Sequence, residues 1–197
     1  MTYPPNDLFQ SVLDRVAAAM GRKPLVLMAI DGMCASGKSA LAERIAGHYP
    51  CNVFHMDDFF LTPEMRTPAR LAEPGGNVDV ERFKAEVLEP LRNGRTVRCR
   101  KYDCGTGAFA PAPPAEPKPL AIVEGAYSLH PRLRNAYDLA VGLRVSPDAQ
   151  LRRIAAREGE GRAPDFITRW IPLENHYIEK TGVWARCDLV IDTSGLF

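Results

Sequence analysis

Five short runs of apolar residues recur along the chain, and helical stretches fill most of the gaps between them. The runs cover residues 25–30, 51–56, 120–125, 139–145 and 188–192. Continuous apolar runs, rather than alternating ones, are typical of parallel strands that are buried on both faces. We therefore predict an α/β fold with a mostly parallel five-stranded sheet, helices on both faces and the first run as its central strand.

Helical spacing is visible near the N-terminus. Within residues 1–22, apolar side chains recur three or four positions apart, which predicts an amphipathic helix: Leu8, Val12, Leu13 and Val16. A further helix is expected over residues 80–92.

Residues 94–119 interrupt the alternation of strands and helices. The first part, 94–104, predicts an extra strand or small hairpin element, whereas 105–119 is so rich in Gly, Pro and Ala that we expect an irregular surface loop. No repeat or linker divides the chain, and 197 residues fit one domain. We predict a single domain over residues 1–197.

Composition narrows the class of protein. The formal net charge of +1 gives no general reason to expect a nucleic-acid or membrane partner. No apolar run approaches the ~20 residues of a spanning helix, and the N-terminus lacks the pattern of a signal peptide, so we expect a cytoplasmic protein. The five cysteines are scattered and never form C-x-x-C, which favours reduced thiols over disulfides or a zinc site.

The sequence GMCASGKS, residues 32–39, matches the phosphate-binding loop G-x-x-x-x-G-K-[ST]. It directly follows the first predicted strand and precedes a helical stretch, which is the context that the motif requires. Its glycines let several backbone N–H groups point at one anion, at the positive end of a helix. Lys38 would meet the β- and γ-phosphates and the Ser39 hydroxyl would coordinate Mg²⁺. We expect ATP to bind to Gly32, Ala35, Ser36, Gly37, Lys38, Ser39 and Ala40.

Small-molecule kinases, GTPase switches and motor-like ATPases all share this loop. A guanine-reading N-K-x-D motif would favour a GTPase, but none of the asparagines is followed by lysine. A kinase is therefore the leading hypothesis, and a nucleotide-binding regulatory ATPase or GTPase is the alternative.

Carboxylates are placed where the predicted strands end. Asp31, Asp57, Asp58 and Glu124 each fall at such an end, and ligands of open parallel sheets bind at this edge. Acids that converge on a phosphate loop suit Mg²⁺ and a reacting hydroxyl. Singly, each could be a polar strand end or a helix cap, which we favour for Asp31. Strand alternation would send Asp57 and Asp58 to opposite sides.

Several motifs together resemble the uridine kinase family of phosphate-loop kinases, which is related to phosphoribulokinase and bacterial pantothenate kinase. They are DGMCASGKS, FHMDDFF, RFKAEVLEPLRNGRTVRCRKYDC, AIVEGAY and DLVID, in that order. The resemblance covers roughly residues 25–193. The C-terminal FITRWIPLENHYIEKTGVWARCDLVID looks like a less characterised bacterial branch of this family.

The resemblance implies roles for individual residues. Asp57 takes the part of catalytic base and metal-shell ligand, Ser39 and Glu124 complete the metal shell, and Phe60 forms a wall of the substrate site. Tyr102, with Asp103 after it, falls in the region that holds the nucleoside.

Two positions of the predicted acceptor site match the family pattern less closely. Glu73 aligns with an acid that contacts sugar hydroxyls, with Asp79 as its competitor. Cys104 stands where the family has an aromatic residue, and no histidine partner follows it, which puts pyrimidine specificity in doubt.

Arginines in residues 150–164 suggest a lid. Arg152, Arg153, Arg157 and Arg162 lie on a predicted helix that breaks into a glycine-containing loop. A planar guanidinium can bind phosphate through two N–H groups, and a closing lid excludes water from the transfer. Arg157 and Arg162, beside the break, are the catalytic candidates, whereas a solvated helix face is an equal explanation for Arg152. His55, His130 and His176 are isolated in sequence and are interpreted as structural.

The sequence thus predicts an ATP- and Mg²⁺-dependent kinase that phosphorylates a hydroxyl of a small metabolite, with a nucleoside 5′-hydroxyl as the leading acceptor. Pantothenate, a sugar phosphate or another hydroxyl compound is the alternative. We expect no nucleic-acid or membrane partner and leave open a homo-oligomer.

Overall fold

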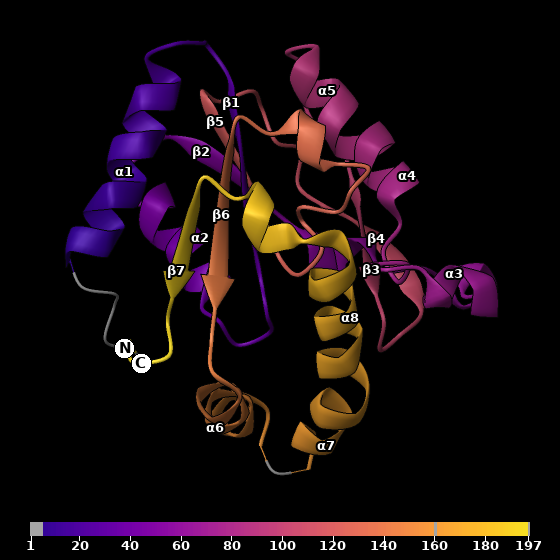
Figure 1. The fold of residues 1–197 in the computed structure, drawn as a ribbon. Coiled ribbons are helices and arrows are strands. Elements are labelled where there is room, and N and C mark those ends of the chain that lie inside the picture. Colours follow the sequence, from indigo (N-terminus) through magenta and orange to yellow (C-terminus); the bar gives the residue numbers. More distant parts are fainter. Residues whose placement is uncertain (1–5, 160, 197) are drawn as a thin grey trace.

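A five-stranded parallel sheet forms the centre of the computed structural model, which describes residues 6–159 and 161–196. The strand order is β2-β5-β1-β6-β7 (Figure 1). The strands are β1 Val26–Gly32, β2 Cys51–His55, β5 Leu120–Glu124, β6 Leu139–Arg144 and β7 Leu189–Asp192. The prediction of five parallel strands with the first at the centre is confirmed.

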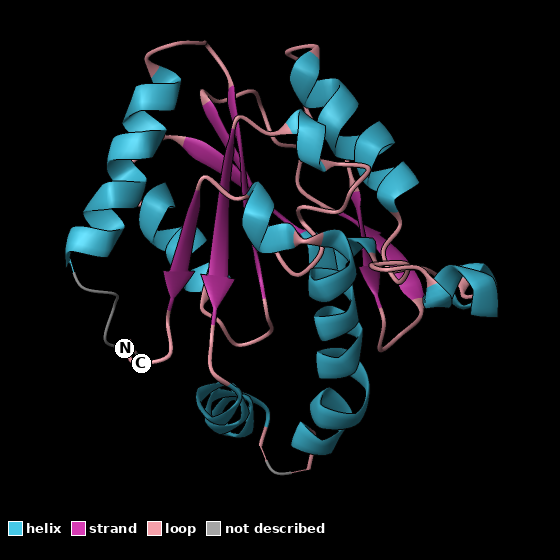
Figure 2. Ribbon diagram, viewed as in Figure 1, coloured by secondary structure: helices cyan, strands magenta, loops and turns pink. Residues whose placement is uncertain are grey.

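Helices cover both faces of the sheet (Figure 2). On one face lie α1, Asn6–Met20, and α2, Lys38–Ala46. On the other lie α8, Ile171–Thr181, and a continuous helix built from α4, a π-helical turn and α5: Val80–Phe83, Lys84–Leu88 and Glu89–Arg92. All seven residues of β1 are buried, because its side chains alternate between these two layers. This explains why the strand is a continuous apolar run in the sequence.

The segment after α5 forms an antiparallel hairpin, β3 Arg100–Asp103 and β4 Ala108–Pro111. The extra strand is confirmed, but the prediction that all of 105–119 is irregular is wrong, because β4 lies within it. Proline is tolerated since both strands of an isolated hairpin are edges. The buried Arg82 of α4 donates to the carbonyl oxygens of Arg100, at 2.6 Å, and Asp58, at 2.8 Å. The hairpin is thereby fixed beside the turn that follows β2.

After β6 the chain enters a helical segment that begins beyond the carboxyl end of this strand and leads to α8 (Figure 1). It consists of α6, Pro147–Glu158, the short α7, Ala163–Asp165, and a π-helical turn, Phe166–Trp170, which continues into α8. The remaining short elements are η1 Met56–Phe59, η2 Pro63–Met65, α3 Pro68–Ala72, η4 Arg134–Ala136 and η6 Val183–Arg186. Among the helices that the structure describes, none is long and apolar enough to span a bilayer.

Candidate active site

The phosphate-loop sequence lies between β1 and α2, as its motif requires. Two of its residues adopt left-handed backbone conformations, Ala35 with φ 57° and Gly37 with φ 93°. Gly32 has no room for a side chain, because a Cβ there would lie 2.2 Å from the carbonyl oxygen of Leu143. The loop then enters α2 at Lys38, so free N–H groups at the start of this helix face the loop. A tight turn of this kind can cradle an anion.

Lys38 folds back over the loop. Its Nζ donates to the carbonyl oxygens of Gly32, at 3.0 Å, and Met33, at 2.8 Å. The ammonium group is therefore held at the mouth of the loop, where the motif would place the β- and γ-phosphates of a nucleotide.

Ser39, Glu124 and His55 meet at the carboxyl edge of the sheet. The Ser39 hydroxyl donates to Glu124 Oε1 at 3.1 Å, and His55 Nδ1 lies 2.6 Å from the same oxygen. The hydrogen bond to Glu124 raises the pKa of His55. His55 is therefore not isolated in the fold, because β2 and β5 are neighbours and their register sets His55 opposite Glu124. Its interpretation as a structural residue stays a prediction.

Asp57 and Asp58 lie one turn beyond β2, on η1. The prediction that strand alternation separates them is wrong, because the strand ends at His55 and the two acids follow in a 3₁₀ turn. Asp58 pairs with Lys101 of the hairpin at 3.0 Å. Part of the Asp57 residue is exposed to solvent, but desolvation of its carboxyl by the surrounding protein raises the pKa of that group, an effect that the nearby Lys38 opposes and Glu124 reinforces. Asp57 thus lies in the electrostatic field of the loop lysine.

The oxygen groups of this edge fit Mg²⁺. A hydroxyl and one or two carboxylates, supplemented by water and nucleotide phosphates, are the ligands that this ion prefers. In the part of the chain that the structure describes, no three His, Cys, Asp or Glu side chains cluster to form a metal site by themselves. Such a partial ligand set suits an ion that arrives with a nucleotide.

The predicted acceptor residues are spread over three elements. Phe60, directly after η1, packs on Trp170 with ring centroids 5.6 Å apart. Tyr102 is buried and packs against Phe109 within the hairpin, at 5.1 Å between ring centroids. Asp103 accepts from the backbone N–H of Gly105 at 2.7 Å, so it stabilises the hairpin turn.

Glu73 and Asp79 have different surroundings. Glu73 is exposed at the end of α3 and pairs with Arg70 at 3.6 Å. Asp79 is buried, caps α4 and accepts from the backbone N–H of Arg82 at 3.0 Å. Asp79 is thus occupied by the fold, and Glu73 is the more accessible of the two.

The predicted lid arginines differ from one another. Arg157 and Arg162 both contact the carboxylate of Glu158, at 2.9 and 3.3 Å. Arg153 instead donates to the carbonyl oxygen of Ala35 in the phosphate loop at 3.1 Å. Arg152 is exposed. The helix break expected from the sequence is found where α6 ends, at Gly159 with φ 78°.

Several residues at the site were not predicted. Glu174 of α8 accepts from the backbone N–H of Cys34 at 2.7 Å, and Gln150 of α6 donates to the Cys34 carbonyl oxygen at 3.1 Å. Asp31, interpreted as a strand-end residue, is fully buried and accepts from the Tyr177 hydroxyl at 2.7 Å. No local motif marks these residues, because their partners are distant in sequence.

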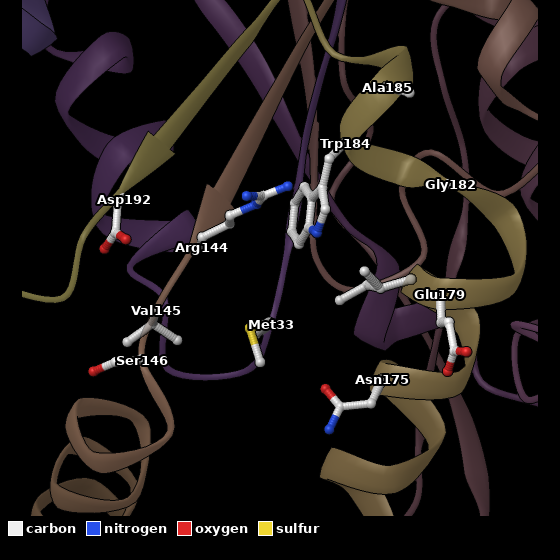
Figure 3. A pocket seen from close by; sticks show the side chains of 11 residues that line it. Met33, Arg144, Val145, Ser146, Asn175, Glu179, Gly182, Trp184, Ala185 and Asp192 are labelled. Carbon is white, nitrogen blue, oxygen red and sulfur yellow. The ribbon is translucent and has the colours of Figure 1, made fainter.

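A hollow of about 790 Å³ opens beside the phosphate loop (Figure 3). Of the loop it contains only Met33, and Arg144 lies over the ring of Trp184 at its rim. The other lining residues are Val145, Ser146, Asn175, Ile178, Glu179, Gly182, Ala185 and Asp192. None of the predicted catalytic residues lines this hollow, so the candidate chemistry is located at the loop and the acids of β2 and β5.

Comparison with solved structures identifies the fold. A possible uridine kinase from Bacillus stearothermophilus superposes with a TM-score of 0.66 at 21% identity, over 92% of this chain and 100% of that one. D-glycerate 3-kinase from Cryptococcus neoformans gives 0.62 at 14% identity, over 88% and 89%. Phosphoribulokinase from Rhodobacter spheroides gives 0.57 at 15% identity, over 86% and 70%.

The protein therefore has an α/β fold with a five-stranded parallel sheet and a small antiparallel hairpin, which matches structures of phosphate-loop kinases. No protein-family model and no curated protein matches the sequence.

Proposed function

We propose that the protein is an ATP- and Mg²⁺-dependent kinase that transfers the γ-phosphate to a hydroxyl of a small metabolite. The observation that carries this proposal is the contact between the loop hydroxyl of Ser39 and Glu124 of β5, with Asp57 in the field of Lys38. This arrangement supplies a phosphate cradle, oxygen ligands and a base within one site, which are the parts that phosphoryl transfer requires.

Each residue has a distinct role in the proposed reaction. Asp57 orients the acceptor hydroxyl and accepts its proton while the hydroxyl oxygen bonds to the γ-phosphorus and ADP leaves. Lys38 neutralises charge on the β- and γ-phosphates. Ser39, Asp57 and Glu124 would hold Mg²⁺, which supplies charge stabilisation to the phosphates when bound. Arg157 and Arg162 would exchange Glu158 for phosphate as the lid closes.

A nucleoside is the first candidate for the acceptor. The resemblance of the FHMDDFF and KYD motifs to uridine kinases supports it, and Phe60 and Trp170 offer aromatic rings beside the catalytic turn. Glu73, exposed, would contact the sugar hydroxyls.

A hydroxyl acceptor other than a nucleoside is the second candidate. Tyr102 is buried and Asp103 is engaged in the hairpin turn, so neither side chain is presented as a free surface for a base. D-glycerate 3-kinase and phosphoribulokinase, which share the fold, are named for acceptors that are not nucleosides.

A panel of acceptors distinguishes these candidates. Purified protein is incubated with Mg²⁺, ATP or GTP, and uridine, cytidine, pantothenate, glycerate or sugar phosphates, and nucleoside diphosphate release is measured. We expect release to depend on one acceptor, with a phosphorylated product visible by mass spectrometry. Release that is slow and equal with every acceptor would instead indicate a regulatory nucleotidase.

A further inference from the structure

The Cys34 peptide in the phosphate loop is held from outside by two helices. Its N–H donates to Glu174 Oε2 of α8 at 2.7 Å, and its carbonyl oxygen accepts from Gln150 Nε2 of α6 at 3.1 Å. The next carbonyl, that of Ala35, accepts from Arg153 of α6 at 3.1 Å. Since α6 ends at the helix break at Gly159 and α8 lies beyond that break (Figure 1), the loop is held by helices on both sides of the break.

These hydrogen bonds from α6 and α8 surround a strained part of the loop backbone. Ala35 has φ 57°, a left-handed conformation that is unfavourable for a residue with a Cβ. Such conformations persist where surrounding contacts fix them. The contacts on Cys34 and Ala35 therefore provide a physical means of keeping the first half of the loop in a single shape.

The buried position of Glu174 is energetically unfavourable for a carboxylate. Only 6% of its surface is exposed, and burial raises the pKa of its carboxyl, while the charges of Lys38 and Asp57 also act on it. Desolvation of a buried carboxylate offsets much of the stability that its hydrogen bonds contribute. What a glutamate supplies here, and an apolar side chain would not, is an acceptor for the loop N–H of Cys34.

We propose that Glu174 is a positioning residue for nucleotide binding, which fixes the Cys34 N–H and with it the phosphate-binding shape of the loop. This inference rests on the proposed function only in that the loop binds a nucleotide. A loop that is already ordered loses less conformational entropy when the phosphates bind, which increases affinity.

The variant Glu174→Met tests the proposal, because methionine fills a similar volume without a carboxylate. We expect equilibrium unfolding to show a protein that is folded but less stable than wild type, because the Cys34 N–H is left without its acceptor. Calorimetry on the folded variant should show Mg·ADP binding weakened by about tenfold, as expected for loss of a hydrogen bond to a charged group. In turnover assays the KM for ATP should rise while the KM for the acceptor stays within about twofold.

Two further variants separate positioning from other roles. Glu174→Gln keeps an acceptor oxygen and should bind Mg·ADP within about threefold of wild type. Glu179→Gln removes a carboxylate from the exposed side of the same helix and should leave binding unchanged.

The proposal is overturned if Glu174→Met binds Mg·ADP as wild type does. It is also overturned if Glu174→Gln binds as weakly as the methionine variant, because negative charge rather than hydrogen bonding would then be responsible. Binding needs no acceptor, so a failure to find an acceptor leaves this test readable. A wild-type chain that binds no nucleotide would refute both this role and the proposed function.

Discussion

The carboxylates of Asp57 and Asp58 are adjacent in sequence but have different electrostatic surroundings. Asp58 is neutralised by Lys101 of the hairpin at 3.0 Å. Asp57 has no such partner within salt-bridge distance among the described residues, and the charges of Lys38, Glu124 and His55 act on it. A carboxylate that is left available beside the loop lysine is suited to accept a proton, whereas one held in an ion pair is not.

Asp57→Asn should therefore abolish most phosphoryl transfer. Because loss of a general base typically costs 10²- to 10⁴-fold, we expect turnover to fall by about that factor while Mg·ADP binding changes little. Steady-state kinetics and calorimetry measure the two effects separately. Asp58→Asn serves as the matched control, since a partly exposed ion pair contributes about 1 kcal/mol or less. If instead Asp58→Asn is the inactive variant, Asp58 is the base.

The pH dependence of turnover gives a second test of Asp57. The surrounding protein raises the pKa of this carboxyl above 3.8, its ordinary value. A base must be deprotonated to act, so turnover should be lost as the pH falls through the raised pKa, and the acid limb should lie above pH 3.8. Rates at saturating substrate between pH 4 and 8, with circular dichroism to confirm folding, measure the limb. Constant turnover down to pH 4 would contradict the role.

At the residue scale, local motifs were predictable and long-range contacts were not. The phosphate loop and the acids at strand ends follow from short patterns, because strand, turn and helix are adjacent in sequence there. Glu174 and Cys34 are 140 positions apart, and His55 and Glu124 are 69 apart. Such pairs depend on strand order and helix packing, which no short pattern encodes.

At the scale of elements, a carboxylate of the lid is expected to compete with bound nucleotide for two lid arginines. Glu158, at the end of α6, contacts both Arg157 and Arg162. These are the two arginines proposed to bind phosphate, so the carboxylate and a nucleotide would compete for the same guanidinium groups. The competition is limited, because both arginines are exposed and such pairs are weak.

Glu158→Gln should accordingly lower the KM for ATP by about two- to fivefold, which corresponds to at most about 1 kcal/mol. The variant Arg162→Ala, which removes one of the two arginines, should instead raise the KM for ATP. Asp148→Asn, at the first turn of the same helix, provides the control for a general change in charge. An unchanged KM for ATP in both lid variants would show that these arginines do not meet the nucleotide.

The hairpin shows why elements differ in predictability. Buried strands were correctly predicted because burial on both faces demands an unbroken apolar run. All four residues of β4 are exposed, so no such demand acts on them. Their pairing with β3 is instead set by backbone hydrogen bonds and the turn at Asp103. The residue types of β4 therefore give almost no indication of this pairing in the sequence.

At the scale of the molecule, the strand order determines which segments lie next to the phosphate loop. With β1 between β5 and β6, the loop has the acids of β5 and η1 on one side and the lid segment after β6 on the other. The class of fold could be predicted from the repeated strand-helix pattern. Beyond the central position of the first strand, the particular order could not be predicted, because each remaining apolar run would fit any buried place in the sheet.

Buried His130 should make the stability of the whole molecule depend on pH. Burial, with nearby Arg132 and Arg70, lowers its pKa to about 4, against 6.5 for an exposed histidine. Between these values the unfolded chain binds a proton that the folded chain does not, so stability is full above pH 6.5 and falls as the pH drops towards 4. The full difference corresponds to about 3 kcal/mol.

Urea unfolding of His130→Gln and wild type at pH 7.5 and 4.5 measures this effect. The variant loses the contact of the ring, so its stability is expected to be lower at pH 7.5, but its stability should fall less between the two pH values because glutamine does not titrate. His176→Gln, at an exposed position of α8, should keep the wild-type dependence. If His130→Gln also keeps it, other groups account for the loss of stability in acid, and the His130 ring is solvated more than its 6% exposure indicates.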